Sequence, residues 1–224
     1  MKETKSNWAC VADVMKQQPE IAFGRYVSYC YYKTPRRILH SISYYKFAAK
    51  LIGKEKRVLD VGCNEGIGTW VLAKECGFAK GVDFDAQAIE TAKSNFPYPN
   101  IQFSAGDIFE GNPNEPWDAV LNFDVIEHIY PEHAEQFMGK LKSHVSDTGL
   151  VVIGTPSLVS QQFASEIAKK GHVNVYSPQR LEEMMARHFE FVFLFAANDE
   201  VVHTGYLPLA HYLIAIGCKK RIVS

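Results

Sequence analysis

Three glycines, Gly62, Gly66 and Gly68, follow a short apolar run that ends at Val61. Glycine lets a backbone approach a ligand closely, and the N-terminus of a following helix offers free N–H groups to that ligand. The spacing Gly-x-x-x-Gly-x-Gly differs from the Gly-x-Gly-x-x-Gly of dinucleotide-binding proteins, so it disfavours a nicotinamide or flavin dinucleotide. A tight turn without a ligand would contain similar glycines, so a second signal is needed.

Two carboxylates supply that signal. Asp83, in Gly81-Val82-Asp83, follows Gly62 by 21 residues, and Asp107 lies further along in Gly106-Asp107-Ile108. The two oxygens of Asp83 match the two vicinal hydroxyls of a ribose, and Asp107 is placed to accept from an adenine amino group. Ligands of open α/β sheets bind at the C-terminal ends of strands, where all three groups are expected. Together they predict an adenosine-type ligand.

A third cluster, Asp124-Val125-Ile126-Glu127-His128, is open to three interpretations. In the first, Asp124 and Glu127 orient the loop and His128 packs against a partner. In the second, His128 is a general base, because an imidazole pKa of about 6.5 suits proton removal near neutral pH. In the third, Asp124, Glu127, His128 and the later His172 bind a divalent ion such as Mg²⁺, Mn²⁺ or Zn²⁺, which would activate a hydroxyl.

Residues 23–47 are rich in aromatic and basic side chains. One interpretation is a packed helical cap whose Lys and Arg side chains extend to solvent. The other is a lid over an acceptor pocket, in which tyrosines stack on the acceptor and cations hold a phosphate or carboxylate. The tentative substrate-binding residues are Tyr29, Arg36, Tyr44 and Tyr45, with Lys33 and Arg37 as further cations. Residues 155–176 would form the opposite wall, with Gln161, Gln162 and His172 as its polar groups.

The elements that position these groups alternate between strands and helices from residue 57 onward. Short apolar runs predict strands at 57–61, 79–83, 101–104, 119–123, 149–154, 190–196 and 211–219. Helices are expected at 67–76, at 85–95 capped by Asp85, at 131–144, and at 178–189 capped by Ser177. The expected fold is a doubly wound, Rossmann-like α/β sheet of seven strands with helices on both faces. It is mostly parallel, and the last two strands form an antiparallel hairpin.

The motif set, spread over residues 55–195, resembles the class I methyltransferases that use S-adenosylmethionine. The resemblance rests on residues 58–68, 81–83, 106–108 and 123–129. It implies that Gly62 and Gly66 line the methionine part of the cofactor with Asp60 beneath it, and that Asp83 and Asp107 hold the ribose and adenine. The full implied cofactor set is Asp60, Gly62, Cys63, Asn64, Gly66, Asp83, Phe84, Asp107, Ile108, Phe123 and Asp124. The segment Cys63-Asn64-Glu65 departs from the usual smaller, glycine-containing turn.

The resemblance implies transfer of a methyl group, and we expect the acceptor to be a hydroxyl of a small polar molecule. A sugar, nucleotide-linked or polysaccharide-precursor acceptor is favoured; N-methylation, methylation of an RNA end, and a catalytically silent binding module are the alternatives. Glu127, His128 and His172 are the candidate catalytic residues. The metal hypothesis rests on a similarity to metal-assisted O-methyltransferases that act on quinone precursors or RNA ends.

Net charge, apolar runs and cysteine content indicate which partners and which cellular compartment to expect. The 224 residues carry a net charge of −1, which argues against DNA as a partner. No apolar run approaches the ~20 residues of a membrane span. Residues 1–7 lack the apolar core of a signal peptide, and five scattered cysteines suit reduced thiols, so we expect a cytoplasmic protein. Residues 1–50 are expected to form a helical cap or lid, and residues 51–224 the cofactor-binding domain. Oligomeric state has no signal in the sequence.

Overall fold

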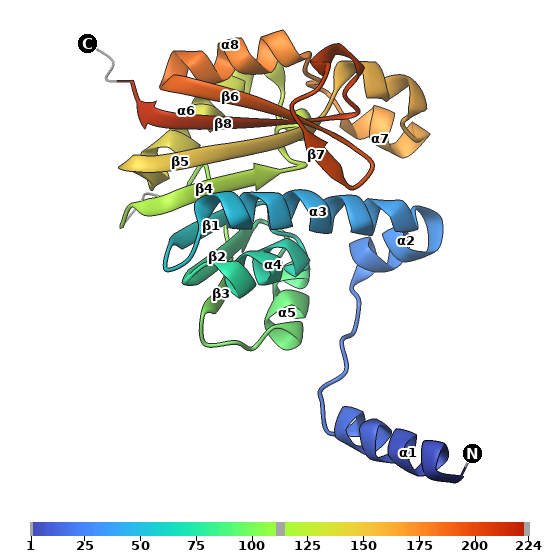
Figure 1. Ribbon diagram of the computed structural model, residues 1–224. Helices are drawn as coiled ribbons and strands as arrows, with labels where there is room; N and C mark the ends of the chain where they lie inside the picture. The colour runs from blue at the N-terminus through green and yellow to red at the C-terminus, as the bar shows by residue number, and fades with distance from the viewer. Residues whose placement is uncertain (1, 111–114, 222–224) are drawn as a thin grey trace.

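The computed structural model describes residues 2–110 and 115–221, whose strands form one eight-stranded sheet (Figure 1). In spatial order the strands are β3 (Ile101–Ala105), β2 (Phe78–Asp83), β1 (Arg57–Val61), β4 (Trp117–Phe123), β5 (Val145–Pro156), β8 (Tyr212–Lys220), β6 (Phe189–Asn198) and β7 (Val201–His203). Neighbours from β3 to β5 are parallel, whereas β8 is antiparallel to β5 and β6, and β7 is antiparallel to β6. The predicted doubly wound sheet with an antiparallel C-terminal part is confirmed.

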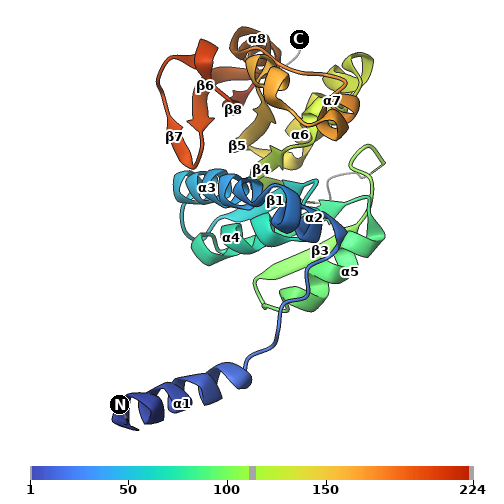
Figure 2. The same cartoon turned by 90° about the vertical axis from the view of Figure 1, so that its right-hand side faces the viewer.

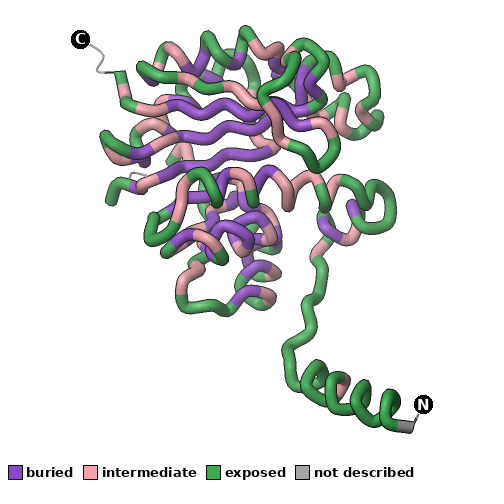
Figure 3. The backbone as a smooth tube through the Cα atoms, viewed as in Figure 1, coloured by how far each residue is buried: buried purple, intermediate pink, exposed green. Residues whose placement is uncertain are grey.

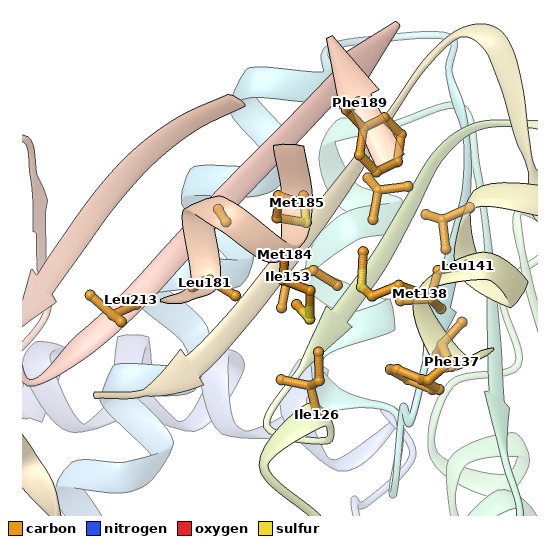
Figure 4. Close-up of a cluster of buried hydrophobic side chains, with 14 of the residues drawn as sticks. Ile126, Phe137, Met138, Leu141, Ile153, Leu181, Met184, Met185, Phe189 and Leu213 are labelled. Carbon is orange, nitrogen blue, oxygen red and sulfur yellow. The ribbon is translucent and has the colours of Figure 1, made fainter. Parts of the chain in front are cut away.

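The central strands are apolar on both faces because helices cover both. Along β1, Leu59 and Val61 belong to one buried cluster and Val58 belongs to another. This division follows from the alternation of side chains across a pleated strand. Figure 4 shows the first cluster, in which Met138 and Met185 from two helices pack near Ile153 of β5.

The helices that cover the sheet carry the apolar side chains of these clusters. One face holds α3 (Pro35–Ile52), α4 (Ile67–Glu75) and α5 (Ala86–Asn95), and the other holds α6 (Ala134–His144) and α8 (Pro178–His188). Two predicted caps are confirmed. Asp85 accepts from the backbone N–H of Gln87 and Ala88 at the start of α5, and Ser177 accepts from that of Arg180 in α8.

The N-terminal region consists of α1 (Lys2–Lys16), α2 (Arg25–Lys33) and all but the last two residues of α3. Pro35 is the first residue of α3, so it separates α2 from α3 as its missing N–H predicts. In Figures 1 and 2, α1 stands apart from the body at the end of residues 17–24, and Figure 3 shows it exposed almost throughout. Helix α3 runs across the proposed domain boundary at residue 50. None of the helices described here has the length and apolar character needed to cross a bilayer.

The structure differs from the expectation in the number of strands. Seven strands were predicted, but the described residues form eight, because β7 pairs with β6 within the connection to β8. Three residues are too short a stretch for an alternating pattern to identify. The remaining short elements are the 3₁₀ helices η1 (Ile126–His128), η2 (Pro131–His133), η3 (Leu158–Phe163) and η4 (Leu207–Leu209), and the helix α7 (Glu166–Gly171).

Candidate functional site

A cavity of about 620 Å³ lies where β1, β2 and β4 end, and helices α2 and α3 contribute to its wall. This volume falls within the range of small-molecule sites in proteins. Of the eleven residues predicted to bind a cofactor, ten line the cavity: Gly62, Cys63, Asn64, Gly66, Asp83, Phe84, Asp107, Ile108, Phe123 and Asp124. The eleventh, Asp60, is fully buried. The topology therefore brings the predicted set together around one space.

The glycine turn, residues 62–68, has a backbone that explains its composition. Gly62 and Gly66 have φ values of 80° and 81°, in the left-handed region that favours glycine. A Cβ on Gly62 would lie 2.2 Å from a methyl carbon of Val125, so this position also lacks space for a side chain. Asn64, in the segment that departs from the usual glycine-containing turn, has a φ of 48°, and asparagine is among the residues that tolerate this region.

Asp60 supports the glycine turn from below. Its oxygens accept hydrogen bonds from the Tyr45 hydroxyl at 3.0 Å and from Thr69 Oγ1 at 2.6 Å. Burial raises the pKa of Asp60 to about 7, against the opposing effect of these two hydrogen bonds. The side chain thus joins β1, α3 and α4 behind the cavity wall.

Asp83 and Asp107, the predicted partners of a ribose and an adenine, both line the cavity. Asp83 accepts the N–H of Asn64 at 2.8 Å through Oδ2 and that of Asp85 at 2.9 Å through Oδ1. Each oxygen keeps a lone pair for a further donor. Asp107 accepts the N–H of Phe109 at 2.8 Å. Phe84, 85% exposed beside Asp83, presents an aromatic ring at the cavity.

An ion pair also lines the cavity. Arg37 Nη2 is 2.8 Å from Asp124 Oδ1, and the Tyr44 hydroxyl donates to Asp124 Oδ2. The Asp124 charge raises the pKa of Arg37 well above its ordinary value, so the guanidinium stays charged. Burial and the same carboxylate raise the pKa of Tyr44, so its hydroxyl stays neutral and remains a donor. The ring of Tyr44 stacks on that of Tyr212, with centroids 4.7 Å apart.

The predicted substrate-binding residues are divided by the structure. Tyr44 and Tyr45 line the cavity, although their hydroxyls are held by Asp124 and Asp60. Tyr29 and Arg36 are exposed and do not line it. Their helices turn them outward, and the next residue of each helix, Cys30 in α2 and Arg37 in α3, lines the cavity instead. Because successive helical residues point about 100° apart, one residue of each adjacent pair reaches the cavity.

The candidate catalytic residues Glu127, His128 and His172 lie together, with one ligand atom of each within 4.8 Å of the others. Glu127 is fully buried, and its Oε2 accepts from Thr155 while its Oε1 has no protein partner. Burial, followed by the charge of Asp124, raises the pKa of Glu127 to about 8. Asp124, the fourth residue of the predicted metal set, is held by Arg37 and Tyr44.

The two imidazoles differ in their exposure to the cavity. His128 lines the cavity, and its Nδ1 lies 2.8 Å from the carbonyl oxygen of Gly171. A carbonyl oxygen can only accept, so Nδ1 carries the proton and Nε2 carries the lone pair in the neutral ring. His172 is not among the residues that line the cavity, and its ring centroid is 5.2 Å from that of His128. Its Nδ1 lies 3.0 Å from Gln161 Oε1, and burial lowers its pKa. Gln162, the other polar candidate of this wall, bonds to the carbonyl of Val159.

One polar residue of the site carried no recognisable signal in the sequence. Glu65, in the glycine turn, is buried, and its carboxylate accepts from backbone N–H groups of Gly24, Tyr26 and Val27. Backbone donors are present at nearly every position, so no residue pattern marks this contact. The partners could be identified only from the folded chain.

Known proteins resemble this chain in sequence. The profile of a family described as "Methyltransferase domain" matches residues 32–192. A probable S-adenosylmethionine-dependent methyltransferase of Mycolicibacterium smegmatis is 27% identical over 122 residues, which cover 54% of this chain and 45% of the relative. A ubiquinone biosynthesis O-methyltransferase of Bradyrhizobium is 29% identical over 129 residues, covering 57% and 50%. The chain thus spans about half the length of the curated relatives it matches.

Solved structures share the fold at low sequence identity. The DhpI–SAH complex superposes with a TM-score of 0.63 at 18% identity and covers 86% of this chain and 90% of its own. The N-methyltransferase NodS of Bradyrhizobium japonicum, in complex with S-adenosyl-L-homocysteine, has a TM-score of 0.60 at 16% identity, with 82% and 86% covered. At these identities the likeness concerns the fold alone.

Proposed function

Because the chain belongs to the methyltransferase domain family, we propose that it transfers a methyl group from S-adenosylmethionine to a hydroxyl of a small polar acceptor. The cofactor would occupy the cavity with its ribose on Asp83 and its adenine between Phe84 and Asp107. When bound, it supplies an electrophilic methyl group on a sulfonium. The protein's own tasks are to hold two reactants in line, to exclude water and to remove a proton.

The Arg37–Asp124 pair suits the amino-acid end of this cofactor. A methionine head carries a carboxylate and an ammonium, and the cavity wall presents a guanidinium and a carboxylate 2.8 Å apart. Arg37 is the one Lys or Arg side chain among the described residues that line the cavity. We therefore assign Arg37 to the carboxylate and Asp124 to the ammonium of the cofactor.

The observation that carries the choice of a hydroxyl is the orientation of His128. Its Nδ1 donates to the Gly171 carbonyl, so Nε2 is the basic atom of a ring that lines the cavity. A hydroxyl must lose its proton as it attacks the methyl group, and a positioned imidazole performs such a transfer. Ser41 and Tyr26 add polar groups to the lining of the same cavity, which favours a polar acceptor such as a sugar or a nucleotide-linked molecule.

A metal-assisted form of the same reaction is favoured by one specific observation, the unpartnered Oε1 of buried Glu127. A divalent ion there would be held by Glu127, His128 and His172, whose chemistry suits Mn²⁺ or Zn²⁺. Such an ion would lower the pKa of a bound hydroxyl. In this form His128 would be a ligand rather than a base, so the two assignments are mutually exclusive.

Calorimetry with S-adenosylmethionine and S-adenosylhomocysteine tests the cofactor assignment. We expect one site per chain for both compounds, and no heat of binding would contradict the proposal. Methyl transfer is then measured with methyl-labelled cofactor and fractionated small-molecule extracts, and the labelled product is analysed for an O-methyl or N-methyl group. Binding without transfer to any fraction would favour a silent binding module.

A further inference from the structure

Glu65 takes no part in the chemistry proposed above, yet the residue is only 4% exposed and both of its carboxylate oxygens accept hydrogen bonds. Oε2 accepts from the N–H of Gly24 at 2.9 Å, and Oε1 accepts from that of Tyr26 at 2.7 Å. The N–H of Val27 is 3.4 Å from both oxygens. These donors belong to the beginning of α2, about 40 residues earlier in the chain.

This contact supplies α2 with the cap that its own sequence lacks. Helix α2 begins at Arg25, and the capping residue Gly24 has no side chain to bond the free N–H groups. A carboxylate at a helix N-terminus satisfies those donors and interacts favourably with the helix dipole. Apart from Val27 and Cys30, the side chains of α2 are partly or fully exposed, so apolar packing contributes little to holding it in place.

Gly24 leaves the space that the Glu65 carboxylate occupies. A Cβ built on Gly24 would lie 2.5 Å from both Cδ and Oε1 of Glu65. Its φ of −78° is accessible to any residue. Glycine is therefore required here for space and not for backbone conformation, which makes Gly24 a specific probe of the contact.

The same residue also connects to the cofactor side of the cavity. The N–H of Glu65 donates to Asn64 Oδ1 at 2.7 Å, and the N–H of Asn64 donates to Asp83 Oδ2 at 2.8 Å. A short series of contacts thus leads from the proposed ribose acceptor to α2. On α2, Tyr26 and Cys30 line the cavity.

We propose that Glu65 is a positioning residue that fastens α2, as a lid, to the glycine turn. Ordering of the turn by the cofactor and closure of α2 over the cavity then occur together. For the identity of the cofactor this inference rests on the proposed function. The fastening itself is a property of the protein without any ligand.

Hydrogen exchange in the ligand-free protein tests the fastening. Glu65→Ala should raise the exchange rate of the amides at 24–27 about tenfold or more, because a hydrogen bond to a charged group is lost. Glu65→Gln keeps the volume and one acceptor oxygen, so it should give a smaller rise. Glu75→Gln is the matched control, since Glu75 pairs with Lys50 across α4 and α3. Unchanged exchange in a folded Glu65→Ala protein would overturn the proposal.

A double-mutant cycle separates this contact from a general loss of structure. Gly24→Ala should raise exchange in the wild-type background, because the new methyl group displaces the Glu65 carboxylate. In the Glu65→Ala background the clash is gone, so Gly24→Ala should add less than about twofold. Additive effects would contradict a direct contact. If Glu65→Ala fails to fold, the cycle is run with Glu65→Asp, whose shorter side chain withdraws the carboxylate from the space that the new methyl group takes.

S-adenosylhomocysteine then tests the coupling. We expect it to slow exchange at 24–27 in the wild type and to dissociate at least about threefold faster from Glu65→Ala. In that variant its effect on exchange at 24–27 should be lost, and an equal effect in both proteins would refute the coupling. If the wild type does not bind the compound, the proposed function fails, while the ligand-free exchange still decides the role of Glu65.

Discussion

Arg37 Nη2 lies 2.8 Å from Asp124 Oδ1, so a cation from the N-terminal helices meets an anion from the loop after β4 on the cavity wall. Asp124 holds a φ of 59°, which is uncommon for a residue other than glycine. Its N–H donates to the carbonyl of Gly154, and Tyr44 occupies its second oxygen. The carboxylate is therefore fixed in a direction that a zwitterionic ligand can use.

The Arg37 assignment predicts a loss of cofactor binding. Arg37→Met should weaken S-adenosylhomocysteine about 10- to 100-fold, the value of one or two charge-assisted hydrogen bonds. Arg36→Met is the control, because Arg36 is exposed and does not line the cavity. Isothermal titration of both variants and the wild type measures the difference. Equal affinity in Arg37→Met would remove this residue from the cofactor site.

The raised pKa of Asp60 predicts a pH-dependent stability. Its pKa changes from 3.8 in an ordinary setting to about 7 when buried, so between these values the folded protein binds a proton that the unfolded chain releases. Stability from this group is therefore complete at low pH and decreases as pH rises from about 4 to about 7. The full change is on the order of 4 kcal/mol.

Asp60→Asn removes this titration and keeps an acceptor for Tyr45 or Thr69. The unfolding free energy of Asp60→Asn, measured in urea between pH 4.5 and 7.5, should gain on that of the wild type as pH rises. A constant difference between the two proteins across this range would show that Asp60 does not titrate there.

The base assignment predicts a defect in transfer and not in binding. His128→Gln should reduce the rate of methyl transfer by about 10²- to 10⁴-fold, the usual contribution of a general base. The affinity for S-adenosylhomocysteine should stay within about threefold. His133→Gln, at an exposed position five residues later, should behave like the wild type. A transfer rate of His128→Gln equal to that of the control would contradict the assignment.

Chelation distinguishes the base from the metal-assisted form. If His128 acts as a base, EDTA should leave the transfer rate within about twofold, and calorimetry should show no heat with Mn²⁺ or Zn²⁺. A loss of activity that Mn²⁺ restores would move the role to Glu127, His128 and His172. In that case Glu127→Gln and His172→Ala should each abolish the binding of the ion.

Substitution by alanine should have opposite effects on stability at Gly68 and at Gly139. A Cβ on Gly68 would lie 2.1 Å from the ring of Tyr45, which is buried and bonded to Asp60. Gly68→Ala should therefore destabilise the protein by about 1–3 kcal/mol through overpacking. Gly139, in α6, has nothing within 4 Å of such a Cβ, so Gly139→Ala should be neutral or stabilise by up to about 1 kcal/mol. The free energies of unfolding of the two variants and the wild type are measured in urea at one pH. Similar changes in the two variants would contradict the packing argument.

The parallel part of the fold could be predicted from the sequence because its central strands β1, β4 and β5 contain short apolar runs that are buried on both faces. The positions of Gly62, Asp83 and Asp107 followed from the rule that strand ends meet at one edge of the sheet. The antiparallel part could be recognised, but the spatial order of its strands could not be predicted. The placement of β8 between β5 and β6 depends on pairing of segments that are distant in the sequence.

For the N-terminal helices, the sequence could not show which residues reach the site. Composition identified an aromatic and basic segment, but it could not distinguish Arg36 from Arg37, because helix phase alone decides which one reaches the cavity. Glu65 carried no signal, since its partners are backbone N–H groups of a distant helix. Contacts made through backbone atoms leave the side-chain pattern unchanged.

The place of β8 in the sheet has a consequence for biosynthesis. During translation β5 and β6 leave the ribosome before β8, which lies between them and bonds to both. Until Tyr212–Lys220 has emerged, each of these strands presents an open edge that can pair with another nascent chain. Closure of this half of the sheet therefore waits until Tyr212–Lys220 has emerged, and a chain interrupted before Tyr212 should be recovered as aggregate or as a chaperone complex.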